Sequence, residues 1–523
     1  MNMEVLGDVT ASLVLILAWS SFLVVLARNI VSVSQLLTAA WVFARRIKPA
    51  PRSIDLWSRY EDLMPPVSVI APAFNEELSI VDSVKALLSL QYPEHEVIVV
   101  NDGSKDATLE RLITAFDMAP VERQQIVALQ TTRIREVYAS PRHPNLLVVD
   151  KENGRKADAA NAGIGFATTP LICIIDADSI IEPDGLLRAT EPFMTDTGDL
   201  VAVGGAIRIA NGSIVNSGHI ERIQVSDKWL PRFQIIEYLR AFLTARVANA
   251  HLDMLLLISG AFGIFKRAVV VEVGGYRHDT VGEDLELVTR IHRHMREQGR
   301  PYRIEFIPEI VCWTEAPETL AGLRNQRSRW QQGALETLQR HAAMIGNPRY
   351  GRIGLIAMPL VVLEDVLGPP MELIGYLVFP VAYALGILNG EAALAFLSLT
   401  FVFGTAVSVG TLALEERQLR RTPCAADLSR IALAALVENF GYRQVNLIFR
   451  LRGIWRFLRK DSHWASVPRT GFARVGYGKT EWPLLEERRA AEAEPTPYDT
   501  DAIAMGSQED IASHATQSQR QAG

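Results

Sequence analysis

Apolar runs near both ends of the 523-residue chain are long, whereas those in between are short and alternate with polar segments. The run at 9–27 carries no charge and approaches the roughly 20 residues that a helix needs to cross a bilayer. Arg28 and further cations follow this run rather than precede it, which argues against a cleaved signal peptide and predicts that the following segment is cytoplasmic. We therefore expect a membrane anchor and an interfacial segment within 1–50, where the apolar stretch 30–44 is either a second span or a helix at the interface.

A second apolar block occupies residues 350–450 and predicts C-terminal transmembrane and interfacial helices. Its apolar segments are 353–367, 371–389, 392–414 and 428–449. The middle two are the convincing spans, because the outer two are shorter or contain charged residues that lipid disfavours, such as Glu364 and Arg443. The outer segments either cross the membrane or lie at its interface, and both arrangements return the basic juxtamembrane segment 451–480 to the cytoplasm.

The middle of the chain predicts an α/β domain over about 65–335. Short β-branched runs at 67–71, 96–100, 146–149, 171–175 and 201–204 alternate with helical stretches, a pattern typical of a parallel sheet. In such sheets ligands bind beyond the carboxyl ends of the strands. We therefore expect Asn75, Asp102 and the pair Asp176 and Asp178 to gather along one edge of the sheet.

Composition narrows the class of protein further. Hydrophobic residues make up 49% of the chain and charged residues only 21%, which excludes a disordered chain. The three cysteines, Cys173, Cys312 and Cys424, are widely spaced, so neither a disulfide framework nor a zinc site is predicted. The formal charge of −6 belongs to an acidic tail at 481–523, which predicts disorder there and leaves no basic face for nucleic acid elsewhere.

Two carboxylates follow the expected strand at 171–175, in the triplet Asp176-Ala177-Asp178. Hard oxygen ligands at this spacing suit Mg²⁺ or Mn²⁺ with a diphosphate as a further ligand. Short acidic triplets also occur at helix starts, and Asp102 followed by glycine is equally typical of an Asx turn. The position of both features at strand ends favours a binding site.

Two later motifs combine groups suited to proton transfer and phosphate binding. Glu283 and Asp284 open an amphipathic stretch, where a carboxylate either caps the helix or accepts a proton from an attacking hydroxyl. Gln326, Arg329 and Trp330 stand just before the second apolar block. A guanidinium can clamp phosphate oxygens and an indole offers an apolar wall to a sugar face, although the bare spacing also fits a surface helix.

Seven motifs in this order resemble those of family-two glycosyltransferases. They are Pro72-Ala-Phe-Asn75-Glu76, Val100-Asn-Asp102-Gly-Ser104, Gly154-Arg-Lys156-Ala-Asp158-Ala-Ala-Asn161, Asp176-Ala-Asp178, Ser259-Gly260-Ala-Phe262, Gly282-Glu283-Asp284 and Gln326-Arg-Ser-Arg329-Trp330. The set is similar to the processive membrane subgroup that includes cellulose, hyaluronan, poly-N-acetylglucosamine and chitin-oligosaccharide synthases. The resemblance implies a Rossmann-like nucleotide-sugar-binding domain of GT-A type, inserted between N-terminal and C-terminal transmembrane helices.

The resemblance also implies roles for individual residues. Ala71, Asn75 and Glu76 would border the nucleotide pocket, Asp102 would contact the uridine, and Lys156, Asp158, Asp176 and Arg329 would bind the diphosphate and donor sugar. Asp178, helped by Asp176, would hold Mg²⁺ or Mn²⁺. Asp284 would be the general base beside Glu283, and Gln326, Trp330, Ser259 and Gly260 would form the acceptor site.

These roles imply an inverting transferase that adds sugar from a UDP-sugar to a growing β-linked polysaccharide or oligosaccharide and exports the product. Two alternatives stay open, namely transfer of one sugar to a lipid acceptor and a catalytically inactive membrane scaffold. We expect a multi-pass protein of the inner (plasma) membrane, in contact with the lipid bilayer. Its catalytic domain and tail are expected in the cytoplasm, and export or regulatory subunits are possible partners. The segment 117–145 has no predicted role, and a tryptophan-containing segment at 463–469 resembles a loop that closes over the nucleotide in some relatives.

Overall fold

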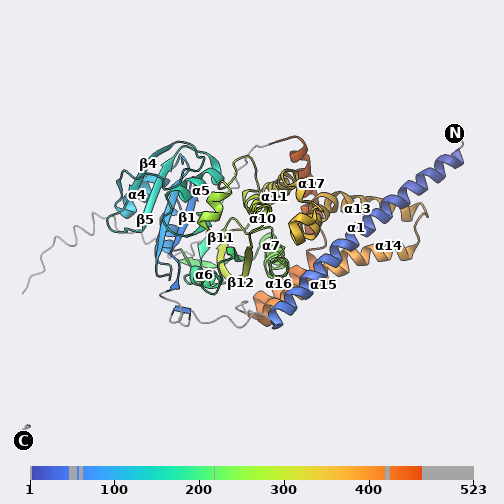
Figure 1. Cartoon of the computed structure of the whole chain (residues 1–523). Coiled ribbons are helices and arrows are strands. Elements are labelled where there is room, and N and C mark those ends of the chain that lie inside the picture. Colours follow the sequence, from blue (N-terminus) through green and yellow to red (C-terminus); the bar gives the residue numbers. More distant parts are fainter. Residues whose placement is uncertain (1–2, 46–55, 58–62, 217, 419–423, 462–523) are drawn as a thin grey trace, which may run out of the picture. The chain divides into compact units, whose positions relative to one another are not determined.

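A computed structural model describes residues 3–45, 56–57, 63–216, 218–418 and 424–461 (Figure 1). All of these residues belong to one compact unit, Met1–Ala473. The expected acidic tail at 481–523 and the tryptophan-containing segment at 463–469 lie outside the described residues.

A mixed sheet of ten strands forms the centre of the described part, in the order β3-β4-β5-β2-β1-β6-β11-β8-β12-β7 (Figure 1). Its parallel core consists of β1 Val67–Ala73, β2 His95–Asn101, β5 Leu146–Lys151 and β6 Leu171–Ile175. The valine, leucine and isoleucine residues of these strands are buried on both faces, as parallel sheets require. The α/β fold and these four strands confirm the prediction from the sequence.

The second half of the sheet is less regular. β11 Phe262–Lys266 lies antiparallel between β6 and β8 Leu200–Ile209, and β12 Arg303–Thr314 runs parallel to β8. The short β7 Ile180–Ile181 pairs with the end of β12. The apolar run at 201–204 predicts part of β8. No comparable sequence pattern predicts β12. Register shifts interrupt its pairing with β8, so its buried positions do not alternate regularly along the chain.

Helices cover both faces of the sheet. One face carries α3 Ile80–Leu88, α4 Thr108–Phe116 and α6 Gly185–Met194, and the other carries α5 Arg155–Phe166, α9 Arg267–Glu272 and α10 Glu283–Glu297. In α10, Leu287, Ile291 and Met295 recur at helical spacing and face the core. The acidic first turn of α10 is thereby left at the end of the sheet.

The segment 117–145 extends the edge of the sheet. β3 Ala119–Pro120 pairs with β4 Ile134–Ala139, and β4 lies antiparallel to β5. The backbone amide of Ile126 donates a hydrogen bond to the carbonyl of Gly165 in α5. The inserted segment is therefore an integral part of the domain.

A helical rod precedes β11, and a long helix follows β12. The rod consists of α7 Trp229–Leu239, the π-helical turn η2 Arg240–Arg246 and α8 Val247–His251. The long helix is α11 Leu320–Arg340, which contains the QxxRW motif. Its amino end is capped by Thr319, whose side chain accepts a hydrogen bond from the amide of Gly322.

Three helical runs in the described residues are long and apolar enough to cross a membrane: Val9–Arg45, Ile353–Ala384 and Gly390–Arg417. The first lies within α1 Met3–Arg45, a single continuous helix. The stretch 30–44 therefore continues the same helix as the apolar run at 9–27, because no turn interrupts the backbone before it.

The other two runs each join several helical segments. The second run comprises η5 Ile353–Ala357, α12 Met358–Val361, η6 Val362–Leu367 and α13 Gly368–Ala384, so it unites the expected segments 353–367 and 371–389. The third run comprises α14 Gly390–Leu397, η7 Ser398–Val402 and α15 Phe403–Gln418.

The last expected apolar segment, 428–449, is divided between two helices, α16 Ala425–Val437 and α17 Tyr442–Leu458. Gly441 separates them with a φ of 102°, a conformation that glycine adopts readily and that interrupts the helix. α17 then packs on α11, where the Ser328 hydroxyl donates a hydrogen bond to the Phe449 carbonyl at 2.9 Å. The segment is therefore two shorter helices in the structure rather than one continuous helix.

Candidate active site

One cavity of about 1470 Å³ connects the ends of the central strands with the helices of the apolar block. We call one side of it the strand end, which is lined by the loops after β1, β2 and β6 and includes Asn75, Asp102 and Asp176. We call the other side the membrane end, which is lined by charged residues of the membrane helices and α17 and includes Arg28 and Glu372.

Most of the site residues predicted from the sequence line this cavity. They are Asn75, Glu76, Asp102, Lys156, Asp176, Asp178, Ser259, Gly260, Glu283, Asp284, Gln326, Arg329 and Trp330. Ala71 and Asp158 do not lie on the wall of this cavity, and each is only 1% exposed. Ala71 packs in the hydrophobic core two residues before β1 ends.

At the strand end, hydrogen bonds join the loop after β1 to the loop after β2. Asn75 has a φ of 57°, in the left-handed region that asparagine tolerates better than most residues. Its side-chain Oδ1 atom accepts a hydrogen bond from the backbone amide of Lys105 at 2.8 Å, and its backbone amide donates to the Ser104 hydroxyl at 3.0 Å. The amide of Glu76 donates to Thr108 Oγ1 at 2.9 Å. These bonds hold Asn75 and Glu76 in place beside Asp102.

Asp102 is held by a buried lysine that the sequence motifs do not identify. Lys151 Nζ lies 2.6 Å from Asp102 Oδ1 and donates to the Glu152 carbonyl at 2.6 Å, and its side chain is fully buried. The Asp102 carboxylate also accepts hydrogen bonds from the amides of Gly154 at 2.9 Å and Arg155 at 2.8 Å. Burial raises the pKa of Asp102, and the hydrogen bond from Lys151 opposes that rise.

Asp158 lies on the far side of the same lysine. Lys151 Nζ is 2.5 Å from Asp158 Oδ1. Thr132, from the inserted segment 117–145, donates to Asp158 through its amide at 2.9 Å and its hydroxyl at 3.1 Å. The carboxylate is thus engaged by the protein itself, which explains why it does not reach the cavity. It also gives the inserted segment a role in supporting the strand end.

Lys156 crosses the centre of the cavity. Its Nζ atom lies 2.5 Å from Asp176 Oδ1 and donates to the Gly260 carbonyl at 3.0 Å. Burial disfavours the charged ammonium, but the negative charges of Asp176, Glu283 and Asp284 raise the pKa of Lys156. This lysine therefore keeps a fixed positive charge beside the acidic residues.

Glu283 and Asp284 form the first turn of α10 and both line the cavity. Asp284 accepts hydrogen bonds from the Leu285 amide at 2.9 Å and from the Gly260 amide at 3.2 Å. Burial and the charge of Asp284 raise the pKa of Glu283, while Lys156 opposes that shift. Two adjacent carboxyl groups thus differ in environment, which is typical of sites that transfer protons.

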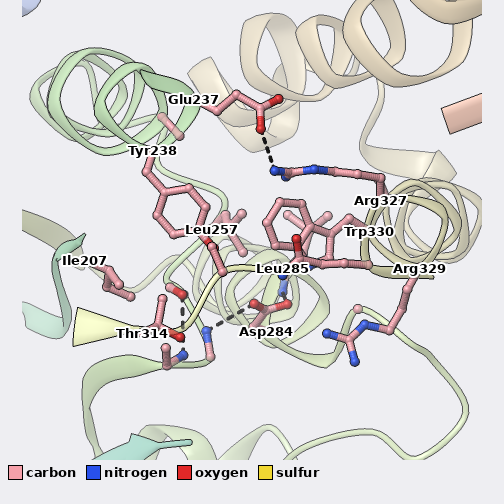
Figure 2. A pocket seen from close by; sticks show the side chains of 18 of the residues that line it. Ile207, Glu237, Tyr238, Leu257, Asp284, Leu285, Thr314, Arg327, Arg329 and Trp330 are labelled. Carbon is pink, nitrogen blue, oxygen red and sulfur yellow. Dashed lines mark hydrogen bonds and ion pairs between the residues drawn. The ribbon is translucent and has the colours of Figure 1, made fainter. Parts of the chain in front are cut away.

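The QxxRW motif lies on α11 and faces the same space as Asp284 (Figure 2). Trp330 is 43% exposed and lines the cavity. Gln326 also lines it, and its buried Oε1 atom accepts no hydrogen bond from any part of the chain that the structure describes. An open indole and a buried amide oxygen are suited to contact the faces and hydroxyl groups of a sugar.

Ion pairs between helices build the membrane end, and no motif in the sequence indicates this pairing. Arg28 of α1 lies 2.6 Å from Glu372 and 3.1 Å from Glu364. Glu372 is shared with Arg443 of α17 at 3.2 Å. All four of these charged residues line the cavity.

Asp176 and Asp178 are the carboxylates on the cavity wall whose chemistry fits a divalent cation. No group of three His, Cys, Asp or Glu side chains suited to a metal occurs in the described ranges. Mg²⁺ usually binds through one or two carboxylates together with substrate phosphates, so a pair of aspartates on the wall of a cavity fits such an ion. Lys156 places an ammonium group 2.5 Å from Asp176 on the same wall.

Three features together define a nucleotide-dependent transferase site. They are the acidic loops at the ends of the parallel strands, the basic groups in the adjoining cavity and the carboxylate pair on α10. The chain belongs to the glycosyltransferase-like family 2, whose model matches residues 65–333.

Two relatives share the name poly-β-1,6-N-acetyl-D-glucosamine synthase. The protein from Staphylococcus epidermidis strain RP62A is 29% identical over 310 residues, which cover 59% of this chain and 64% of the relative. The protein from Staphylococcus aureus strain COL is 31% identical over 275 residues, which cover 52% of this chain and 56% of the relative. The chain therefore spans less than two thirds of the length of either relative.

Among solved structures, a mannosyltransferase from Pyrobaculum calidifontis in complex with GDP-Man and Mn²⁺ is similar to this chain at a TM-score of 0.48 and 20% identity. The similarity covers 81% of this chain and 99% of that one.

Proposed function

We propose that the protein is an inverting glycosyltransferase that adds N-acetylglucosamine from its UDP-activated form to a growing β-linked polysaccharide and exports the chain. The observation that carries the proposal is the single cavity, which joins the acidic strand end, Asp284 and the membrane end. The names of the relatives favour N-acetylglucosamine as the sugar and a polymer as the product.

The donor would lie at the strand end. Asn75, Glu76 and Asp102 line the part of the cavity suited to the nucleoside, since they follow the two central parallel strands. Lys156 and Arg329 would face the diphosphate, whose negative charge grows as the bond to the anomeric carbon breaks. Because the pKa of Lys156 is raised, its ammonium stays protonated throughout this step.

Asp178 and Asp176 would hold Mg²⁺ or Mn²⁺, which would add positive charge near the leaving diphosphate. The two carboxylates come from the loop directly after β6, so the sheet fixes their backbone positions. Asp176 also contacts Lys156, and this places the metal-binding side chain and the phosphate-binding cation on one surface.

Asp284 would act as the general base. Its carboxylate is oriented by the amides of Gly260 and Leu285, and it would remove the proton from the acceptor hydroxyl as that oxygen attacks the anomeric carbon. The bond between the anomeric carbon and the diphosphate breaks on the opposite face, so an α-linked donor gives a β-linkage. Trp330, Gln326 and the Ser259–Gly260 turn would hold the acceptor sugar.

The membrane end would receive the product. Its lining of paired charges offers hydrogen-bonding partners to a polyhydroxylated chain inside an otherwise apolar block. We place the catalytic domain in the cytoplasm, because the cations Arg45, Arg46 and Lys48 follow the long apolar helix and precede that domain.

The test is a UDP-release assay on the full-length protein in lipid nanodiscs with a panel of UDP-sugars, followed by digestion of the product with linkage-specific glycosidases. We expect release of UDP with UDP-N-acetylglucosamine and a product of many residues that only a β-N-acetylglucosaminidase degrades. A lipid-linked product that carries one sugar would show that the protein transfers a single sugar to a lipid acceptor and does not build a polymer. No UDP release with any donor would overturn the transferase function altogether.

A further inference from the structure

Glu237 and Arg327 form an ion pair on the wall of the cavity, and neither has a role in the function proposed above. Arg327 Nη2 lies 2.5 Å from Glu237 Oε2, and Arg327 is only 8% exposed. The pair joins α7 to α11, and the two side chains extend toward each other across the cavity wall (Figure 2).

The Arg327 guanidinium also lies over the indole of Trp330. Its Cζ atom is 4.3 Å from the ring centroid, at a distance typical of a cation–π contact. The two residues are three positions apart on α11, so they lie on adjacent turns of the same helical face. Since Trp330 remains 43% exposed, the guanidinium supports the ring and leaves indole surface open to the cavity beside Asp284 and Leu285 (Figure 2).

α17 holds Glu237 as well. The Tyr442 hydroxyl donates to Glu237 Oε2 at 2.7 Å, and Asn446 Nδ2 donates to Glu237 Oε1 at 2.9 Å. The Tyr442 ring is itself fixed by stacking on Phe233 of α7, with 4.8 Å between ring centroids. Both oxygens of the carboxylate are therefore engaged, which fixes the plane in which Arg327 can pair with it.

We propose that Glu237 is a positioning residue for the acceptor: it acts through Arg327 to fix the plane of Trp330, on which the terminal pyranose of the polysaccharide stacks. This role rests on the proposed function, because it needs a sugar acceptor in the cavity. Loss of the pair would allow the indole to rotate and weaken stacking of the acceptor. Within the described residues, the hydrogen bonds of Glu237 go to Arg327, Tyr442 and Asn446, so the strand end, where the donor would bind, should stay intact.

The test uses the full-length enzyme in nanodiscs with N-acetylglucosamine oligosaccharides as acceptors and saturating UDP-N-acetylglucosamine. Glu237→Gln is expected to raise the acceptor KM about tenfold while kcat and the donor KM change by less than about twofold. Arg327→Lys keeps the charge and the pairing with Glu237 but lacks the planar guanidinium, so it should raise the acceptor KM by a similar factor. The matched control is Glu272→Gln, which removes the exposed ion pair with Arg300 and should behave as the wild type.

Coupling between the sites supplies the second readout. If Glu237 acts through Arg327, the double variant Glu237→Gln/Arg327→Lys should be no worse than either single variant. Additive effects, equal changes in the donor and acceptor KM, or normal acceptor binding by Arg327→Lys would overturn the positioning role. If the wild type transfers sugar and Glu237→Gln keeps a normal acceptor KM, the positioning role is overturned but the proposed function is not. Absence of transfer by the wild type with every acceptor would overturn the proposed function and this role together.

Discussion

The strand end and the membrane end of the cavity are held together by different kinds of interaction. At the strand end, Asp102 accepts hydrogen bonds from the amides of Gly154 and Arg155, which are fixed by the neighbouring strand and the start of α5. At the membrane end, Arg28 pairs with Glu372, which lies 344 residues further along the chain. The first arrangement follows from sheet topology, whereas the second forms only when distant helices have packed.

This difference predicts which kinds of substitution should impair each end of the cavity. Backbone amides remain when a side chain is replaced, so the strand end should lose activity only when a reacting or charge-balancing group is removed. Ion pairs between helices have no backbone substitute, so single substitutions at the membrane end should alter packing and the path of the product. The following substitutions test this contrast.

The largest effect is expected for Asp284→Asn, at the centre between the two ends. The amide keeps the size of the side chain but cannot accept a proton, so the rate of sugar transfer should fall about 1,000-fold. UDP binding, measured by calorimetry, should change less than about twofold, because the strand end is untouched. The matched control Asp279→Asn removes exposed pairs with Arg277 and Arg340 and should keep transfer close to wild type. Full turnover by Asp284→Asn would exclude it as the base.

Lys151→Met should give the next largest effect, and it tests whether side-chain charge matters within the strand end. The substitution leaves the buried carboxylates of Asp102 and Asp158 without their shared cation. Removing one partner of a buried ion pair typically costs about 3–5 kcal/mol, so the melting temperature should fall clearly and the donor KM should rise. Lys105→Met, on the exposed loop nearby, is the control. An unchanged melting temperature would show that the backbone alone supports Asp102.

The sequence predicts the strand end well because its residues follow buried strands directly. Asp102 comes immediately after β2, and Asp176 immediately after β6, so sheet topology alone brings them together. The role of Asp158 rests on the family resemblance instead, and motif spacing does not reveal side-chain direction: Lys156 reaches Asp176, whereas Asp158 of the same helix reaches Lys151. Lys151 carries no signal, because a lysine at a strand end usually faces solvent.

The membrane end could not be predicted in this way. An apolar segment that contains Glu364, Glu372 or Arg443 gives no indication of which charge pairs with which, since each partner lies on another helix. The division of 428–449 at Gly441 is marked in the sequence only by the glycine and the polar residues around it, such as Asn439 and Arg443, which do not by themselves show where a helix ends. Sequence therefore indicates that these charges are protected from lipid, and only the packed structure identifies their partners.

Glu372→Gln is expected to have a moderate effect confined to the membrane end. It removes the shared carboxylate between Arg28 and Arg443, and hydrogen bonds to charged groups contribute about 1.5–3 kcal/mol. We expect a lower melting temperature and shorter polysaccharide products by gel analysis, with an unchanged affinity for UDP. Glu391→Gln, at the exposed start of α14, is the matched control. Weaker UDP binding in Glu372→Gln would show that the two ends are not independent.

The smallest expected effect on stability is that of His292. This residue of α10 contacts the segment before Ser259 through a neutral imidazole. Its imidazole contacts the Leu255 carbonyl at 2.8 Å and the Tyr302 hydroxyl at 2.7 Å, and burial lowers its pKa from 6.5 to about 4. A lowered pKa means that the unfolded chain binds the proton more readily, so this contribution to stability is complete above pH 6.5 and is lost as the pH falls toward 4.

Between about pH 7 and about pH 5.5 the wild type should therefore lose about 1 kcal/mol of stability that His292→Gln does not lose. The measurement is the melting temperature of both proteins across that range, with His294→Gln as a control, because His294 pairs with Glu272 at the edge of the same helix. Parallel curves for wild type and His292→Gln would mean that the imidazole takes up a proton as readily in the folded protein as in the unfolded chain. The helix that carries Asp284 would then tolerate a charge at this position, and the stability of α10 would not depend on a neutral His292.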